Sequence, residues 1–218
     1  MNRNIKKRMR MMNKVNYQKW LDKTIEEQEK EGKVPTLLLH SCCAPCSSYC
    51  IEYLSQFFKI TIFYYNPNIT EESEYRKRVE EQKRFIKQFQ TKHPVSFIEG
   101  DYEPDRFFEI ANGYENVPEG GERCFRCYEM RLREAGRVAK EGNFDYFTTT
   151  LSISPLKNAQ KLNEIGERLS REWDVSYLFS DFKKKEGYKR SIALSAEYDL
   201  YRQDYCGCIF SKKTRNRE

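Results

Sequence analysis

The sequence predicts an α/β fold in which a mainly parallel sheet is flanked by helices and followed by a C-terminal helical segment. Apolar stretches of strand length alternate along the chain with longer, charged stretches of helical composition, and this alternation is typical of strand–helix–strand units. Of the 218 residues, 39% are hydrophobic and 33% are charged. This composition fits a globular protein large enough to bury a core without disulfide staples.

In the first half of the chain, each predicted strand leads into a helix. Residues 17–31 have a charged helical composition that ends at Gly32, and the apolar run 34–40 is expected to be a buried strand. Pro45 suits the first turn of the next helix, expected to continue through 47–58. The other elements expected here are a strand over 59–66, a helix over 71–89, a strand over 95–100 and a short helix over 105–112.

The second half continues the alternation after a turn-rich loop, NVPEGGERC, residues 116–124. The elements expected after it are a helix over 127–142, a strand over 144–151, a helix over 157–171, a strand over 175–180 and a last helix over 190–200. Ligands in parallel α/β folds bind beyond the carboxyl ends of the strands. The segment HSCCAPCSSYC, residues 40–50, lies at such an end.

The net charge of +6 is concentrated in three segments. Residues 1–14 contain six Lys or Arg and no acid, and the other two segments are 183–190 and 212–217. Such segments can contact a phosphate backbone or form a solvated surface. We expect a basic, helical N-terminal extension over 1–33, one α/β domain over 34–211 and a basic tail over 212–218.

The eight cysteines fall into three groups, which favours a chemical role over random packing. No signal peptide or membrane span is apparent, so we expect a cytoplasmic protein without membrane contact, in which clustered thiols serve metal or redox chemistry. Cys124 and Cys127 form a C-x-x-C, which can bind a metal or act as a dithiol. With Cys42 and Cys43 they make four thiolates, enough for an iron–sulfur cluster or for zinc.

The remaining cysteines allow competing interpretations. Cys43 and Cys46 form a second C-x-x-C at a strand-to-helix junction, as in thioredoxin-like oxidoreductases. Cys50 is expected to pack in the core. Cys206-Gly207-Cys208 favours a strained, labile redox disulfide over two further metal ligands. A zinc module that binds RNA through its basic ends is a third, non-catalytic interpretation.

Several motifs in one order resemble the QueH-type epoxyqueuosine reductases over about residues 34–211. They are HSCCAPCS (40–47), YYNPNI (64–69), EYRKR (74–78), EGGERCFRC (119–127), FDYFTTTLSISPLKN (144–158), DFKKKEGYKRS (181–191) and LYRQDYCGC (200–208). The resemblance implies a Rossmann-like, HUP-like fold without a phosphate loop. It also implies reduction of epoxyqueuosine to queuosine at the wobble position of tRNA, the last step of queuosine biosynthesis, without cobalamin.

The resemblance also implies roles for individual cysteines. The ligands of a 4Fe-4S cluster would be Cys42, Cys43, Cys124 and Cys127, and Cys206 with Cys208 would be the redox-active disulfide. Some members of the family have an aspartate at the position of Cys46, where it helps to hold an additional mononuclear iron. Cys46 would either replace that ligand or leave the second iron site empty.

The chemistry of the reaction suggests further residues and partners. Removing an epoxide oxygen as water needs two electrons, from an unidentified donor through Cys206 and Cys208, and two protons, for which Asp204, Tyr205 or a cysteine thiol are candidates. The tRNA anticodon loop could stack on Tyr64 or Tyr65 and contact the basic segment Lys183–Arg190 through its backbone.

Overall fold

The computed structural model describes residues 15–215, with side chains as far as Lys212. The basic residues 1–14 lie outside the described residues, as do 216–218. The strands are β1 (Thr36–His40), β2 (Lys59–Tyr64), β3 (Val95–Glu99), β4 (Tyr146–Thr149) and β5 (Ser176–Tyr177). The helices are α2 (Tyr17–Lys30), α3 (Ala44–Leu54), α4 (Glu72–Gln88), α5 (Pro104–Ala111), α6 (Glu122–Glu141), the 3-10 helix η1 (Thr150–Ile153), α7 (Ala159–Trp173), α8 (Gly187–Glu197) and α9 (Ile209–Arg215).

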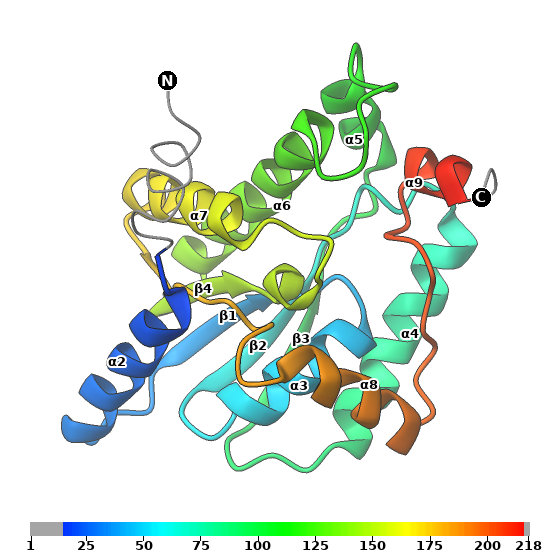
Figure 1. Cartoon of the computed structure of the whole chain (residues 1–218). Coiled ribbons are helices and arrows are strands. Elements are labelled where there is room, and N and C mark those ends of the chain that lie inside the picture. The colour runs from blue at the N-terminus through cyan, green and yellow to red at the C-terminus, as the bar shows by residue number, and fades with distance from the viewer. Residues whose placement is uncertain (1–14, 216–218) are drawn as a thin grey trace, which may run out of the picture.

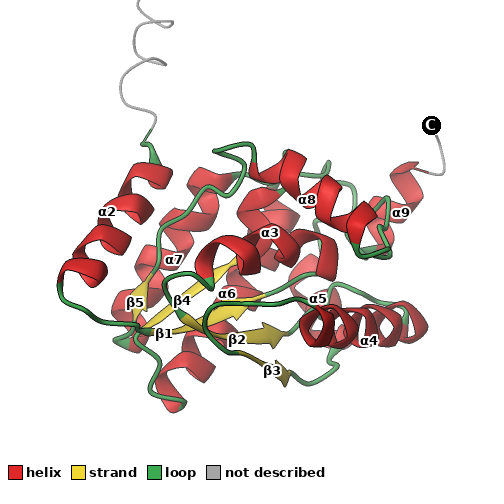
Figure 2. Ribbon diagram, turned by 90° about the horizontal axis from the view of Figure 1, so that it is seen from below, coloured by secondary structure: helices red, strands yellow, loops and turns green. Residues whose placement is uncertain are grey.

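The five strands form one parallel sheet in the order β3-β2-β1-β4-β5, which confirms the predicted fold class. The chain builds outward from β1 through β2 to β3, and then returns to place β4 on the other side of β1. Figure 2 shows β3 at one edge of the sheet and β5 at the other. The strand order therefore reverses between β1 and β4, and ligands bind at this kind of switch point.

Helices cover both faces of the sheet, with α6 and α7 on one side and α3 and α8 on the other (Figure 1). Alternate side chains of β1 enter the two cores: Leu37 and Leu39 pack with α2 and α3, and Leu38 packs with α6 and α7. This two-sided burial explains why the strand is apolar without interruption.

Most predicted elements exist with shifted ends, and two differ more. The expected strand over 175–180 is reduced to Ser176–Tyr177, and residues 209–215 form a helix, α9, that was not predicted. Among the described residues, no helix combines the length and the apolar character needed to cross a membrane.

Candidate active site

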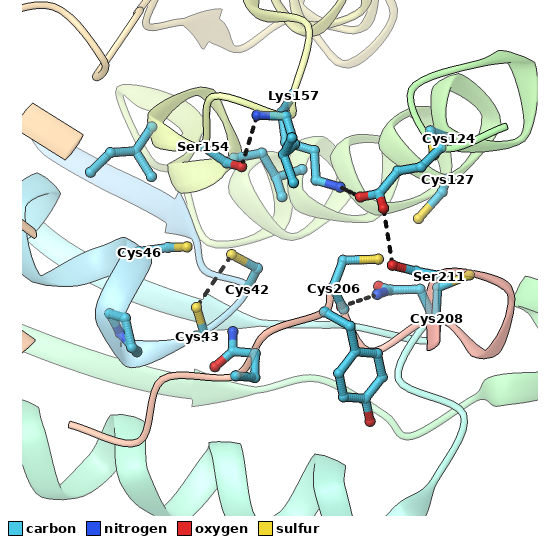
Figure 3. Close-up of a pocket in the computed structure, with 18 of the residues that line it drawn as sticks. Cys42, Cys43, Cys46, Cys124, Cys127, Ser154, Lys157, Cys206, Cys208 and Ser211 are labelled. Atoms are coloured by element: carbon cyan, nitrogen blue, oxygen red, sulfur yellow. Dashed lines mark hydrogen bonds and ion pairs between the residues drawn. The ribbon is translucent and has the colours of Figure 1, made fainter. Parts of the chain in front are cut away.

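A cavity of about 290 Å³ lies beyond the carboxyl ends of the strands and is lined by seven of the eight cysteines. Its wall combines the loop after β1, the segment from η1 to Lys157, the start of α6 and the chain between α8 and α9. Figure 3 shows that cysteines from three distant parts of the sequence face one space. This clustering explains why the sequence carries three separate cysteine groups.

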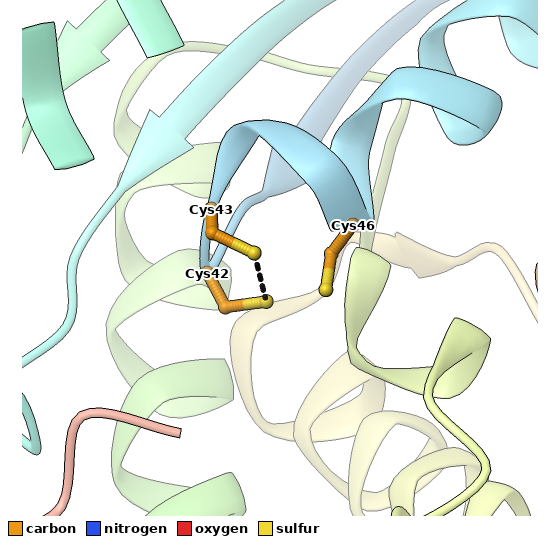
Figure 4. Close-up of side chains that lie close together, drawn as sticks. All are labelled: Cys42, Cys43 and Cys46. Atoms are coloured by element: carbon orange, nitrogen blue, oxygen red, sulfur yellow. Dashed lines mark hydrogen bonds between the residues drawn. The ribbon is translucent and has the colours of Figure 1, made fainter. Parts of the chain in front are cut away.

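The sharp turn from β1 into α3 brings three sulfurs together. Cys43 is the N-cap residue of α3, and Pro45 lies in the first turn, as predicted. The Sγ atoms of Cys42 and Cys43 are 3.8 Å apart, and those of Cys42, Cys43 and Cys46 all lie within 4.8 Å of one another (Figure 4). Two thiolates on one tetrahedral metal at about 2.3 Å would be about 3.8 Å apart. The three sulfurs are therefore spaced as ligands of a metal are.

The three cysteines of this turn differ in the direction in which their pKa values are shifted. Hydrogen bonds from the Cys43 and Cys46 thiols, helped by the Arg131 charge, lower the pKa of Cys42 well below its usual value. The Cys42 hydrogen bond and burial raise the pKa of Cys43 to about 12, and Cys46 also has a raised pKa because of its two cysteine neighbours and burial. A thioredoxin-like nucleophile needs a lowered pKa, so this structure does not support that role for Cys43 or Cys46.

Both cysteines of the second pair lie on a helix, as predicted for Cys127, whereas Cys124 was expected in the loop before it. Helix α6 begins at Glu122, so the C-x-x-C occupies its first turns, where residues three apart share a face. The backbone N–H of Gly120 donates to Cys124 Sγ at 3.3 Å, and Arg131 Nη1 donates to Cys127 Sγ at 3.8 Å. Both sulfurs thus accept from fixed donors at the cavity wall.

The third pair, Cys206 and Cys208, is held in the chain between α8 and α9. Asn68 Nδ2 donates to the Cys206 carbonyl at 3.0 Å, and Gly207 adopts φ of +94°, in the left-handed region. Both residues are free thiols in this structure. A hydrogen bond from Cys208 and the Lys157 charge lower the pKa of Cys206 to about 5 despite burial. Cys206 is therefore a thiolate at neutral pH.

Sequence reasoning missed the charged side chains that surround these sulfurs. Lys157, whose side chain is 9% exposed, pairs with Glu119 at 3.0 Å, and Ser211 Oγ donates to the other Glu119 oxygen at 3.0 Å (Figure 3). Arg78 is buried against Glu74 at 2.6 Å. In a chain that is 33% charged, a single Lys or Arg carries no signal, and only its burial in the fold marks it.

The structure places the other predicted residues as follows. Cys50 is fully buried in the apolar core, as predicted, and Asp204 and Tyr205 line the cavity. Tyr64 and Tyr65 are 0% and 1% exposed, so the expectation that they stack on a base is wrong. Both pack inside the sheet layers, where aromatic strand residues usually lie.

The predicted basic segment is more engaged with the protein than its sequence suggests. Within 183–190, Lys183, Lys185 and Arg190 pair with Asp181, Asp22 and Glu52 respectively. Lys184 is exposed. In the 212–217 segment, Lys212 pairs with Glu71, and the side chains that follow lie outside the described residues, as does the basic segment 1–14.

Comparison with known proteins gives a consistent result. A model of the family described as "Epoxyqueuosine reductase QueH" matches residues 37–214. The chain is 46% identical over 202 residues to the epoxyqueuosine reductase QueH of Staphylococcus epidermidis, covering 91% of this chain and 85% of that protein. It is 43% identical to the one of Streptococcus pyogenes, covering 92% and 79%, and 32% identical to the one of Thermotoga maritima, covering 84% and 93%.

Proposed function

The chain belongs to the epoxyqueuosine reductase QueH family of oxidoreductases, and we propose that it reduces epoxyqueuosine in tRNA to queuosine. The observation that carries the proposal is the cavity at the switch point of the sheet, which gathers seven cysteines from three chain segments. Such a collection of thiols fits a redox reaction and is unsuited to binding a phosphate group.

The donor set fits a thiolate-bound iron cofactor. We propose that Cys42, Cys43, Cys124 and Cys127 hold a 4Fe-4S cluster, because all four line one cavity from two rigid elements. Cys46 Sγ lies within 4.8 Å of the Cys42 and Cys43 sulfurs, so Cys46 is placed to hold an additional iron beside the cluster. When bound, these groups would supply one-electron transfer and a Lewis acid for the epoxide oxygen.

Cys206 and Cys208 are proposed to supply the reducing equivalents. Epoxide deoxygenation breaks two C–O bonds and forms an alkene and water, which needs two electrons and two protons. Oxidation of the Cys206 thiolate and the Cys208 thiol to one disulfide releases two electrons and one proton, and the second proton is taken from solvent. An external electron donor then reduces the disulfide for the next turnover. The lowered pKa of Cys206 favours this step, because the thiolate is the reactive form.

The Lys157–Glu119–Ser211 network is the best placed to hydrogen-bond the leaving oxygen. Lys157 acts electrostatically on Cys206 and is held by Glu119, while Ser211 donates to the same carboxylate. Although burial lowers the pKa of Lys157, the Cys206 sulfur, Tyr128 and Glu119 raise it overall, so the ammonium keeps its proton and donates a hydrogen bond to a leaving oxygen. Asp204 is exposed and Tyr205 is half-buried, so both stand nearer to solvent than Lys157 does.

The mouth of the cavity is suited to an RNA loop. Two of its lining residues are apolar and exposed, Leu156 at 56% and Tyr188 at 37%. Arg202 also lines the cavity and is exposed, and Lys184 lies four residues before Tyr188 on the surface. Exposed rings stack on unpaired bases and cations contact phosphates. We therefore propose that the nucleotides flanking the modified base rest on this rim.

The test is turnover of an anticodon stem-loop bearing epoxyqueuosine, followed by mass spectrometry of the nucleosides. Anaerobically purified protein should contain iron and sulfide and convert the substrate, and Cys206→Ser and Cys208→Ser should abolish turnover while keeping the visible spectrum. Cys50→Ala is the matched control, because it removes a thiol that does not line the cavity. Colourless wild-type protein containing only zinc, or full activity in either serine variant, contradicts the proposal.

A further inference from the structure

Arg131 is a buried cation that directly contacts the sulfur site. It lies on α6 one turn after Cys127, and the residue is 3% exposed. Its Nη1 donates to Cys127 Sγ at 3.8 Å, its Nη2 donates to Asn66 Oδ1 at 2.6 Å, and its Nε lies 3.3 Å from His40 Nε2. The guanidinium therefore joins α6 to the carboxyl ends of β1 and β2.

Among residues 15–215, no carboxylate forms a hydrogen bond or an ion pair with Arg131. Its partners are the Asn66 amide oxygen, the His40 ring and the Cys127 sulfur, and none of them is a carboxylate. The sulfurs of Cys127, Cys42 and Cys206 raise the pKa of Arg131 against the effect of burial.

Three other cations of the cavity have oxygen partners, unlike the Nη1 of Arg131. Arg78 pairs with Glu74 and Lys157 pairs with Glu119. Arg123 donates to three backbone carbonyls of the loop before α6 and so fixes that loop. A buried charge is costly unless it is paired, and of these four cations only Arg131 donates a hydrogen bond to a cysteine sulfur.

We propose that Arg131 is the built-in counter-charge of the sulfur-bound cofactor and raises its reduction potential. The inference rests on the proposed function, because it assumes that Cys42 and Cys127 hold an iron–sulfur cluster. Net charge and hydrogen bonds to the sulfurs set the potentials of such clusters. Reduction adds one negative charge, and a fixed cation with an N–H directed at a ligand sulfur stabilises the reduced state more than the oxidised one.

The decisive measurement is a redox titration of the reconstituted protein, in which electron paramagnetic resonance monitors reduction of the cluster and gives its midpoint potential. Iron and sulfide content are measured on each sample. Arg131→Gln should lower the equilibrium constant for one-electron reduction at least tenfold, which is about 59 mV. Arg131→Lys keeps the charge and should fall between Arg131→Gln and the wild type. Arg133→Gln, on the same helix but partly exposed and paired with Glu129 and Glu172, should leave the potential unchanged.

An unchanged potential in fully loaded Arg131→Gln overturns the inference and leaves the proposed function intact. Wild-type protein that takes up no cluster contradicts the proposed function, because that function assumes an iron–sulfur cluster. Failure of the inference and failure of the proposed function are therefore distinguishable. If Arg131→Gln does not fold, the unaltered protein labelled with ¹⁵N-arginine decides the matter. Pulsed electron paramagnetic resonance of its reduced cluster should show a ¹⁵N coupling, and its absence refutes the inference.

Discussion

Gly207, between the two thiols of the C-G-C pair, offers the sharpest test of how that pair is held. Its φ is +94°, and a Cβ built there would lie 2.6 Å from Ile69 Cγ1 and 3.3 Å from Ile69 Cβ. Ile69 is 1% exposed and packs with Tyr64, Tyr75 and Val79. Ile69 therefore cannot simply move away, so Gly207→Ala introduces both backbone strain and a clash.

The two costs can be estimated separately. A non-glycine residue in the left-handed region costs about 1–2 kcal/mol, and overpacking a filled core costs about 1–3 kcal/mol. The chain around Gly207 is fixed to the domain by a few polar contacts, including Asn68 with the Cys206 carbonyl and Glu81 with the Tyr201 backbone N–H. We expect the strain of about 2–5 kcal/mol to be relieved locally, shifting this segment toward a detached state by roughly 30-fold to several thousand-fold.

The assays are turnover, alkylation of Cys206 measured on its peptide, and urea denaturation. Gly207→Ala should lower turnover at least tenfold and expose Cys206 to faster alkylation, with a small change in global stability. Gly113→Ala is the matched control for backbone strain alone, because Gly113 has φ of +78° with no atom within 4 Å of a built Cβ. Adding Ile69→Ala should restore part of the lost turnover. Wild-type turnover in Gly207→Ala refutes the argument that the glycine fixes the pair.

Two further predictions concern individual side chains. Because the pKa of Cys206 is lowered to about 5, its alkylation rate should stay constant as pH falls from 8 to 6 and drop only near pH 5, unlike that of an ordinary thiol with a pKa of about 8.5. Lys157→Met removes one cause of the lowered pKa and should move the pH profile of alkylation to higher pH. An unchanged profile in this variant contradicts the role of Lys157. Cys46→Ala should lose about one iron atom per chain and keep the visible absorption, if Cys46 holds an iron beside the cluster; unchanged iron content contradicts that assignment.

The fold was predictable because its physical signals are local. Buried parallel strands are short and continuously apolar, helices are long and charged, and their alternation leaves few topologies. The position of the first cysteine group could also be predicted from the sequence. A strand followed directly by a helix that begins with proline places the residues between them beyond the carboxyl end of the sheet. Element ends were less accurate: helix α6 begins at Glu122, before the C-x-x-C, although two glycines precede it.

The side chains around the sulfurs could not be predicted, because their significance depends on contacts between distant segments. Lys157 and Glu119 are 38 positions apart, and Arg131 reaches His40 across 91 positions. No periodicity or spacing marks such pairs in a charged chain. Tyr64 and Tyr65 failed as stacking residues for a related reason, since residues of α4 cover Tyr64 and residues of α6 pack with Tyr65.

Buried cations act on all three cysteine groups and oppose the effect of burial on their thiols. Arg78 acts on Cys43, Arg131 acts on Cys42 and Cys127, and Lys157 acts on Cys206. Burial alone would protonate every one of these thiols, and protonated thiols bind metals poorly and transfer electrons slowly. The cations are fixed by α4, by α6 and by the segment after η1, so their positions do not depend on the cofactor. The fold therefore prepares the charge of the site before any iron or substrate arrives.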